Sequence, residues 1–400
     1  METRVRFVRA QDEAETVVVA RQPILDHLER IVAFELLTPK DGDPREGTAG
    51  VLTQAIADIG LARLAGTRPV HIDVTREFLL SLRPLPFTPD RVILELAADQ
   101  LLLHALKEVH DAGFLIALDA FDGDEDNVFL DLADSVKLNI AALGEEAIEN
   151  AVNVARGRGL HLIADGVQSR EAYGFCRGLG FDAFQGQYFA EPVVVHGASA
   201  PTYRLRALSM LAMNESTSFE QLERVITEDP GLSFKLMKLA NSAFFGGRHR
   251  VGSVRQALMT LGSVTVRRWA TLLVLAGVND RPSHLLELGL LRARLCELVA
   301  TRTPGAEPER AFTVGLFSIV DSLLGTRMHL LIDDLPFDER TSRALGEHEG
   351  PEGHLLAGVL AYERGDFEDC AAAGVSLVDI ARAYGEALDW TDGALVQLTA

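Results

Sequence analysis

The sequence predicts two parts, a (β/α) barrel over residues 1–195 and an all-α domain over residues 205–400. Up to about residue 195, short apolar runs rich in Val and Ile alternate with amphipathic segments, as in a buried parallel sheet. Beyond it, apolar residues recur at helical spacing. Residues 196–204, HGASAPTYR, are small, polar and Pro-containing, and we interpret them as the linker.

Eight strand-length runs occur in the first part: VVVARQPI, RIVAFELL, RPVHIDV, RVILELA, FLIALDAF, SVKLNI, LHLIADGV and DAFQGQYF. Helix-like segments such as GEEAIENAVNVARGRG separate most of them. Eight runs in about 190 residues favour a closed barrel over an open sheet.

The second part carries start and stop signals of helices. Ser218 and Gln221 form a predicted capping box, and Pro230 follows Asp229 at the start of a second helix. Gly246 and its neighbour would end that helix. Segments such as LLELGLLRARLCELVATR continue the pattern, which predicts a helical bundle.

One polar residue interrupts each of seven apolar runs, mostly late in the run. The carboxyl ends of parallel barrel strands converge on one mouth, so these side chains would form a ring there. A single polar residue would be read as a hydrogen-bonded core residue, but seven in succession indicate a shared site. Clustered carboxylates are typical of a divalent-metal site. The seven residues are Glu35, Asp73, Glu95, Asp119, Lys137, Asp165 and Gln185.

Composition limits the class of protein. The chain has 48% hydrophobic and 24% charged residues, no apolar run near the roughly 20 residues of a membrane span, and no secretory signal at its start. We therefore expect a cytoplasmic protein without a membrane partner, with its three cysteines as buried thiols. The net charge of -20 disfavours nucleic acid, although residues 246–256 and 266–269 are locally basic.

The order of motifs resembles a known pair of domains. ARQPILD, FELL, VILELAAD, LIALDAFDG, VKLNI, LIADGVQS and FQGQYFAEP resemble an EAL domain, the barrel that hydrolyses the bacterial second messenger cyclic di-GMP. TEDPGLSFKLMKLANSAFFG, SVRQALMTLG and AFTVGLFSIVDSLLG resemble an HDOD domain, a catalytically silent relative of HD-type phosphohydrolases. The first resemblance covers nearly all of residues 15–195.

The EAL resemblance assigns roles to the ring. Active members use two metal ions to activate a water. It implies metal ligands at Glu35, Asp73, Glu95 and Asp119, catalytic positions at Lys137 and Asp165, and ligand-binding positions at Gln185 and Leu37. We treat all of these as vestiges of a site, for the reasons that follow.

Several positions depart from the family pattern. Ala120 replaces the second Asp of the Asp-Asp-Phe motif and cannot ligate a cation. Asp165 is one methylene shorter than the family's Glu, and the loss of a general base alone costs about 10²–10⁴-fold in rate. We expect no useful hydrolysis and no cofactor, with Mg²⁺ or Mn²⁺ only if the residual site is active. Further replacements are Pro39 for Arg, Asp73 for Asn, Ala98 for an acidic residue and Gln168 for Glu.

Two other segments could suggest metal sites. The acidic loop DGDEDN has Asp122, Asp124 and Asp126 in alternation, but its spacing is not that of a calcium loop, so we favour a solvated loop over a residual cation site. In the helical part, Ser318 and Asp321 stand where a catalytic HD relative would have its His-Asp pair. We expect Asp321 to be a hydrogen-bonded core or interdomain residue.

We therefore favour a catalytically inactive signalling adaptor that binds protein partners, in cyclic di-GMP or stress signalling by resemblance. One alternative is a weak metal-dependent cyclic di-GMP phosphodiesterase that uses the acidic ring with Lys137. Another is a receptor that binds cyclic di-GMP without turnover. A nucleic-acid protein is the least favoured, and a homodimer through the barrels is possible by resemblance. The nucleic-acid alternative would use Arg248, Arg250, Arg255, Arg267 and Arg268.

Overall fold

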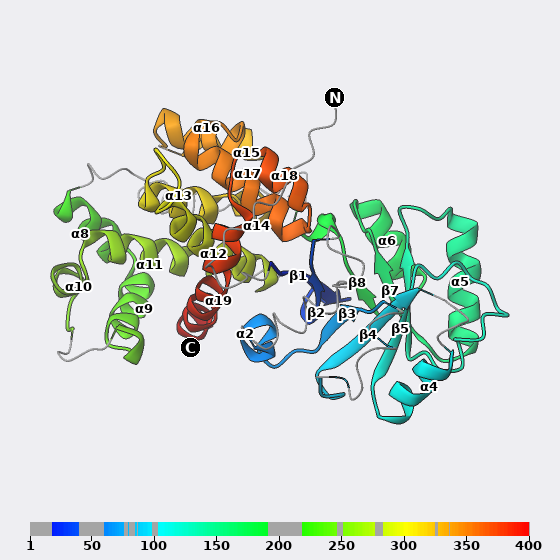
Figure 1. The fold of residues 1–400 in the computed structure, drawn as a ribbon. Helices are drawn as coiled ribbons and strands as arrows, with labels where there is room; N and C mark the ends of the chain where they lie inside the picture. The colour runs from blue at the N-terminus through cyan, green and yellow to red at the C-terminus, as the bar shows by residue number, and fades with distance from the viewer. Residues whose placement is uncertain are drawn as a thin grey trace, which may run out of the picture.

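The computed structural model describes residues 18–39, 60–75, 79, 85, 87–97, 103–190, 218–245, 251–276, 283–324, 327–335 and 337–399. In Figure 1 the strands gather on one side of the molecule, and helices alone make up the other side. The predicted linker, residues 196–204, lies outside the described residues, as do Ala98 and Gly246.

Eight strands close into a barrel in the order of the chain. Each of the eight predicted runs overlaps one of them, so the prediction of a barrel is confirmed. The strands are β1 Ala20–Asp26, β2 Ile31–Leu37, β3 Val70–Asp73, β4 Val92–Ala97, β5 Leu115–Asp119, β6 Ser135–Asn139, β7 His161–Asp165 and β8 Ala183–Phe184.

The first strand departs from a uniformly parallel barrel. β1 pairs antiparallel with both β2 and β8, whereas the other pairs are parallel. The connection to β2 is too short for a crossover, so the two strands form a hairpin. Asp26 holds the turn, because its carboxylate accepts from the backbone N–H of Leu28 and Arg30. Glu29 takes a left-handed φ of 57° there.

Helices cover the barrel where the chain returns between strands. In α5, the buried residues Ile148, Ala151, Val152 and Ala155 lie on one face, as expected of a helix packed on a sheet. Ser169 caps α6 by accepting from the Ala172 N–H. The elements on this side are α2 Leu61–Ala65, α4 Leu103–Asp111, α5 Glu145–Gly157, α6 Arg170–Gly178 and the 3-10 helix η3 Gln187–Ala190.

The helical half contains no strand among its described residues. The predicted capping box of Ser218 and Gln221 is present, and Asp229 caps the helix that begins at Pro230. The elements are α8 Phe219–Glu228, α9 Pro230–Ala240, η4 Ala243–Phe245, α10 Val254–Leu261, α11 Ser263–Ala276, α12 Ser283–Ala300, α13 Pro308–Phe317, α14 Val320–Leu324, α15 Met328–Asp334, α16 Glu339–Gly346, α17 Gly350–Arg364, α18 Phe367–Ala372 and α19 Leu377–Thr399. None of the described helices meets the length and apolarity needed to cross a membrane.

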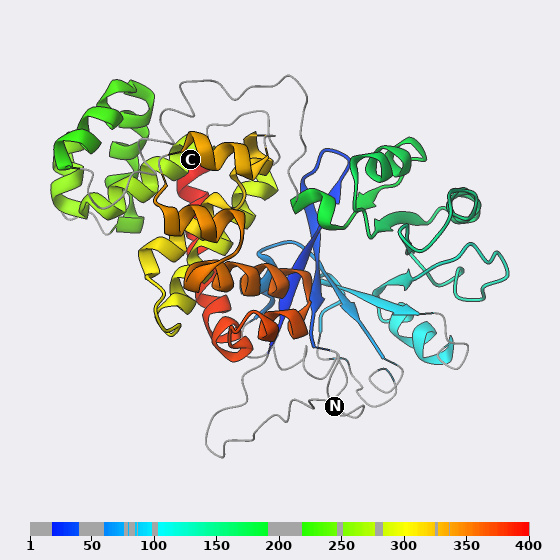
Figure 2. The ribbon, with the colours of Figure 1, turned by 90° about the horizontal axis from the view of Figure 1, so that it is seen from above.

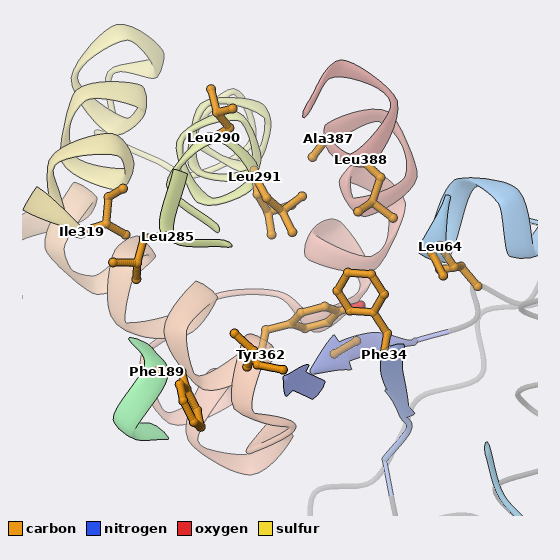
Figure 3. Packing of buried hydrophobic residues seen from close by; sticks show 14 of the residues in the cluster. Phe34, Leu64, Phe189, Leu285, Leu290, Leu291, Ile319, Tyr362, Ala387 and Leu388 are labelled. Carbon is orange, nitrogen blue, oxygen red and sulfur yellow. The ribbon is translucent and has the colours of Figure 1, made fainter. Parts of the chain in front are cut away.

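The two halves share one hydrophobic core. β1 and β2 lie between the helical half and the remaining strands (Figure 2), and α17 packs on β1 while α19 packs on α2. Figure 3 shows Phe34 and Leu64 from the barrel side meeting Leu291, Tyr362 and Leu388 from the helical side. We call this contact between the barrel and the helical half the seam, and buried apolar side chains from both halves form it.

Candidate functional site at the barrel mouth

The inward face of the barrel is built in layers. Ile24, Ala33 and Ile163 form a small apolar cluster with Ala183 inside the barrel. Side chains alternate along a strand, so residues two positions away share the inward face. Gln22, Glu35, Asp165 and Gln185 stand at that distance and place polar groups above the apolar layer. The polar ring predicted from the sequence is thus a consequence of the strand period.

The centre of the site is a buried charge cluster, here called the mouth cluster, formed by Glu35, His71, Glu95 and Lys137. The Lys137 ammonium donates to Glu35 Oε2 at 2.7 Å and to the two Glu95 oxygens at 3.1 and 3.3 Å. His71 Nδ1 lies 2.7 Å from Glu95 Oε1. Side chains of Lys137 and Glu95 are 4% and 2% exposed, so water screens this cluster little.

The cluster sets the ionisation of its members. Burial would raise the pKa of Glu95, but the Lys137 charge and the His71 hydrogen bond hold it at about 2. Burial and the neighbouring Glu95 charge raise the pKa of Glu35, and Lys137 only partly opposes them. Burial would lower the pKa of Lys137, yet the two glutamates raise it above its ordinary value. Lys137 is therefore a permanent cation and Glu95 a permanent anion at neutral pH.

Gln185 links the cluster to the hairpin strand. It is fully buried, and its Nε2 donates to Gln22 Oε1 at 2.7 Å and to Glu35 Oε2 at 2.5 Å. Its Oε1 is buried and has no hydrogen-bond partner in the described part of the chain. The next residue must be Gly186, since a Cβ there would lie 2.3 Å from the Val167 carbonyl oxygen. A buried amide oxygen without a partner is a natural contact for a donor group of a ligand.

Three aspartates extend the ring toward the rim. Asp73 stands beside Glu95 in the strand register and is exposed, and Asp119 stands beside Ala97 and is half-buried. Asp165 closes β7, where burial raises its pKa while the Lys137 charge opposes that rise. Asp165 also acts on the cluster through its charge, which is among the causes that raise the pKa of Lys137.

The arrangement of these side chains does not fit a metal ion. Among the described residues, no group of three or more His, Cys, Asp or Glu side chains is close enough to share one. The predicted ligands Glu35 and Glu95 do lie together, but the Lys137 ammonium contacts both. Asp73 and Asp119 do not join them in a ligand set. A cation is already supplied by the protein itself.

Leu37 lies against the helical half. A Cβ at Gly365 would come within 2.9 Å of Leu37 Cδ1, so the glycine that ends α17 is required for this close contact. Leu37 follows Glu35 by two residues on β2, and the end of this strand therefore connects the mouth to α17.

The positions that depart from the family pattern lie at or near the rim. Ala120 is exposed and has a φ of 51°, a left-handed conformation that Asp and Asn adopt more readily than Ala. Gln168 is exposed and Pro39 is half-buried. In the acidic loop, Asp122 and Asp124 accept from backbone N–H groups two residues on, and both remain exposed.

In the helical half, Ser318, at one of the positions of the missing His-Asp pair, contacts a buried ion pair. Arg292 contacts Glu363 at 2.7 Å and donates to Ser318 Oγ at 2.8 Å. Asp321 is half-buried on α14, and burial raises its pKa while the Ser322 N–H opposes that rise. It lines a cavity between the two halves of the molecule, in keeping with the interdomain position expected for it.

Sequence reasoning missed two residues of the mouth. His71 stands two residues before Asp73 in RPVHIDV, so strand alternation could have placed both on one face. Gln22 could not be found in this way, because β1 is antiparallel to its neighbour. The polar residue that reaches the mouth therefore comes early in this strand, before Ile24, and not late as in the other runs.

Comparisons with known proteins follow the same division of the chain. A model of the EAL domain matches residues 71–192, and a model of the HDOD domain matches residues 199–328. The uncharacterized protein YuxH of Bacillus subtilis is 28% identical over 402 residues, covering 94% of this chain and 98% of that protein. CdgJ of Vibrio cholerae, named a cyclic di-GMP phosphodiesterase, is 29% identical over 406 residues, covering 95% and 94%.

Among solved structures, BlrP1 of Klebsiella pneumoniae in a complex with manganese and cyclic di-GMP matches with 17% identity. The match has a TM-score of 0.35 and covers 45% of this chain and 56% of that one. A score this low adds no argument to the domain matches. The EAL match begins at residue 71, so Glu35 and the hairpin lie outside the matched residues.

Proposed function

We propose, from the premise that the chain carries an EAL domain followed by an HDOD domain, that it is a non-hydrolysing regulator in cyclic di-GMP signalling. It would act through protein partners. Cyclic di-GMP enters this proposal through the EAL resemblance and through the relative CdgJ, whose name gives it that substrate.

The replacement of a family carboxylate by Ala120 carries the proposal, and the contact of Lys137 with Glu35 and Glu95 supports it. A site that activates water with metal ions needs several carboxylates turned toward the metals. Here a buried ammonium lies within 2.7 Å of one glutamate and 3.1 Å of the other, and their charges keep it protonated. One ammonium of the protein thus compensates part of the charge of the two glutamates without a metal. Ala120 adds a methyl group where the family pattern has a carboxylate.

The completeness of the fold supports a binding role. The barrel is closed and shares a continuous core with the helical half, although Pro39, Ala120 and Gln168 depart from the catalytic pattern. An intact scaffold with an altered site suits a protein that presents surfaces to others.

A second candidate is a cyclic di-GMP phosphodiesterase. The name of CdgJ favours it, and so does the survival of Glu35, Glu95 and Lys137 in one cluster. This function would require the Lys137 ammonium to leave at least one glutamate so that its oxygens become available. The unpartnered Gln185 Oε1 would then be a contact for the nucleotide in either candidate.

The test is an incubation of the full chain with cyclic di-GMP and Mn²⁺ or Mg²⁺, with chromatography for the linear dinucleotide and calorimetry for binding. We expect no product from the native chain. Product formation at a rate well above a no-protein control would contradict the proposal and support the phosphodiesterase.

A restored variant sharpens that test. The triple substitution Pro39→Arg, Ala120→Asp and Gln168→Glu returns three family residues, and the left-handed backbone at Ala120 accommodates Asp. The matched control is Ala142→Asp, at an exposed position after β6. We expect product only from the triple variant. If neither variant forms product, the three restored residues are not sufficient, and the remaining departures at Asp73, Ala98 and Asp165 are the next to restore.

A further inference from the structure

We propose that the cavity between the barrel and the helical half binds an uncharged, largely apolar small molecule that carries one hydrogen-bonding group. The cavity measures about 360 Å³. Its walls come from β1, β2 and η3 of the barrel and from α12, α14, α15, α16, α17 and α19 of the helical half. None of the four residues of the mouth cluster lines it, although Gln22, which accepts from Gln185 at the mouth, does.

The size and surface of the cavity suit a small organic molecule. Ligand sites are commonly about 300–1,000 Å³ and mostly apolar, with a few placed polar groups. Phe34 and Phe189 line the cavity from the barrel side, and Leu291, Leu360 and Tyr384 line it from the helical side. In Figure 3, Phe34, Phe189 and Leu291 lie around the seam between the two halves.

Two of the ion pairs in the wall join charged groups that both line the cavity. Arg21 lies 3.0 Å from Glu287, and both side chains are less than a tenth exposed. Arg292 lies 2.7 Å from Glu363, with side chains 3% and 11% exposed. A third arginine, Arg364, pairs with Asp366 at 2.8 Å.

Within these pairs, a charged ligand would find Arg21 and Arg292 already held by carboxylates, and Glu287 and Glu363 already held by arginines. The transfer of an uncompensated charge from water into such a site is costly, so the wall selects an uncharged occupant.

Part of the cavity wall offers hydrogen-bonding groups. Ser318 Oγ accepts from Arg292 and donates to the Gly315 carbonyl oxygen at 2.7 Å. Asp321 stands beside it, and burial raises the pKa of its carboxyl group. His348 also lines the cavity, and burial together with Arg364 lowers its pKa. These groups can meet a hydroxyl or an N–H group, which defines the polar part of the ligand.

Because both halves supply its walls, an occupant would stabilise their docked arrangement. A ligand that binds only the docked form raises its stability by mass action. The cavity is thus a place where a small molecule could change the relation between barrel and bundle without entering the mouth.

Two fluorescent probes of one skeleton test the proposal on the full chain. N-phenyl-1-naphthylamine is uncharged and has a single N–H, and 8-anilino-1-naphthalenesulfonate carries an added sulfonate. We expect saturable fluorescence with the uncharged probe and at least about 10-fold weaker binding of the sulfonate. Equal or tighter binding of the sulfonate would overturn the selection for an uncharged ligand.

Two substitutions locate the probe. Leu360→Trp fills the cavity and should weaken binding of the uncharged probe at least 10-fold, whereas Leu330→Trp, at an exposed site on α15, should not change it. Asp321→Ala removes a polar partner and should weaken binding about 5- to 10-fold. Circular dichroism checks that each variant is folded. Binding unchanged in Asp321→Ala and in a folded Leu360→Trp would overturn the proposal, and if Leu360→Trp fails to fold, Asp321→Ala decides it.

Discussion

The mouth cluster and the interdomain pair of Arg21 with Glu287 both bury a cation against glutamate, but they join different parts of the molecule. Lys137 links strands β2 and β4 from its place on β6, all within the barrel. Arg21 links β1 to α12 and also donates to the Leu64 carbonyl oxygen at 2.7 Å. The first arrangement determines the electrostatics of a candidate site, and the second determines where the helical half docks.

The two buried ion pairs also differ in how many cations the glutamates have nearby. At the mouth, two glutamates share one ammonium, so removing the cation leaves two buried carboxylates. At the seam, Glu287 has a second cation nearby, since Arg68 lies 3.5 Å from it. Loss of Arg21 at the seam should therefore lower the free energy of unfolding less than loss of Lys137 at the mouth.

The largest effect is expected from Lys137→Met. It leaves Glu35 and Glu95 without their cation and should lower the free energy of unfolding by about 3–5 kcal/mol. Urea denaturation followed by circular dichroism measures it. The control is Lys107→Met on the exposed face of α4, where a change within about 0.5 kcal/mol is expected. A loss below 1 kcal/mol at Lys137 would show that the mouth cluster is not a buried ion pair in solution.

A smaller loss, about 1–3 kcal/mol, is expected from Arg21→Met, because Arg68 partly replaces the missing charge. The substitution should also uncouple the two halves. Both tryptophans, Trp269 and Trp390, belong to the helical half, so their fluorescence follows that half alone. We expect the fluorescence and circular dichroism transitions to separate.

The control for the seam is Arg158→Met, at an exposed pair with Asp131 on the barrel surface. Coincident transitions in Arg21→Met, with stability equal to that of this control, would mean that the pair does not hold the halves together.

Glu95 at the mouth and Asp321 at the cavity between the halves should contribute to the pH dependence of stability with opposite signs. The pKa of Glu95 is lowered to about 2, so its contribution is present above its ordinary value of 4.5 and is lost as the pH falls toward 2. The pKa of Asp321 is raised by burial, so its contribution is present at low pH and is lost as the pH rises through the raised value.

Two neutral variants isolate these contributions. Glu95→Gln should have a lower free energy of unfolding than the native chain, and this difference should shrink as the pH falls from 4.5 to 2. The free energy of unfolding of Asp321→Asn should rise relative to that of the native chain as the pH rises from 4 to 8. Urea midpoints across this range measure both trends. Slopes of the same sign would contradict the assignment of the two environments.

The smallest effect is expected at the exposed edge of the seam. Arg63 and Asp389 pair across the two halves, but their side chains are 44% and 53% exposed. Arg63→Ala should lower the free energy of unfolding by about 0.2–1 kcal/mol. High salt should reduce this difference between the variant and the native chain, because it screens the exposed pair. A larger, salt-independent loss would place this pair among the interactions that dock the halves.

Much of the fold could be read from local patterns. The eight apolar runs each overlap a strand, and the Ser218 capping box is formed as predicted. The reversal of β1 could not be read, because the turn sequence HLER has no glycine or asparagine and Glu29 itself takes the left-handed conformation. The hairpin is held by Asp26, whose role only the folded chain reveals.

The candidate site was predicted in part. Glu35, Glu95, Lys137 and Gln185 were recognised as polar residues late in apolar runs, and they do meet at the mouth. The metal-binding roles of Asp73 and Asp119 remain predictions. Leu37 was assigned to ligand binding by resemblance, and its packing against Gly365 shows a contact that no local pattern encodes.

The sequence by itself determined the strands, the helices and the inward polar layer, because side-chain alternation and helical spacing depend on neighbours in the chain. The tertiary structure decided that Lys137 reaches Glu35 across 102 residues and that Arg21 reaches Glu287 across 266. Hydrogen bonds and ion pairs form only when the distance between two atoms is right to within a few tenths of an ångström. Closure of the barrel and docking of the helices set these distances. Chain pattern alone carries no such distances, and so it could not show that Lys137 contacts both glutamates at the mouth or that a cavity lies between the two halves.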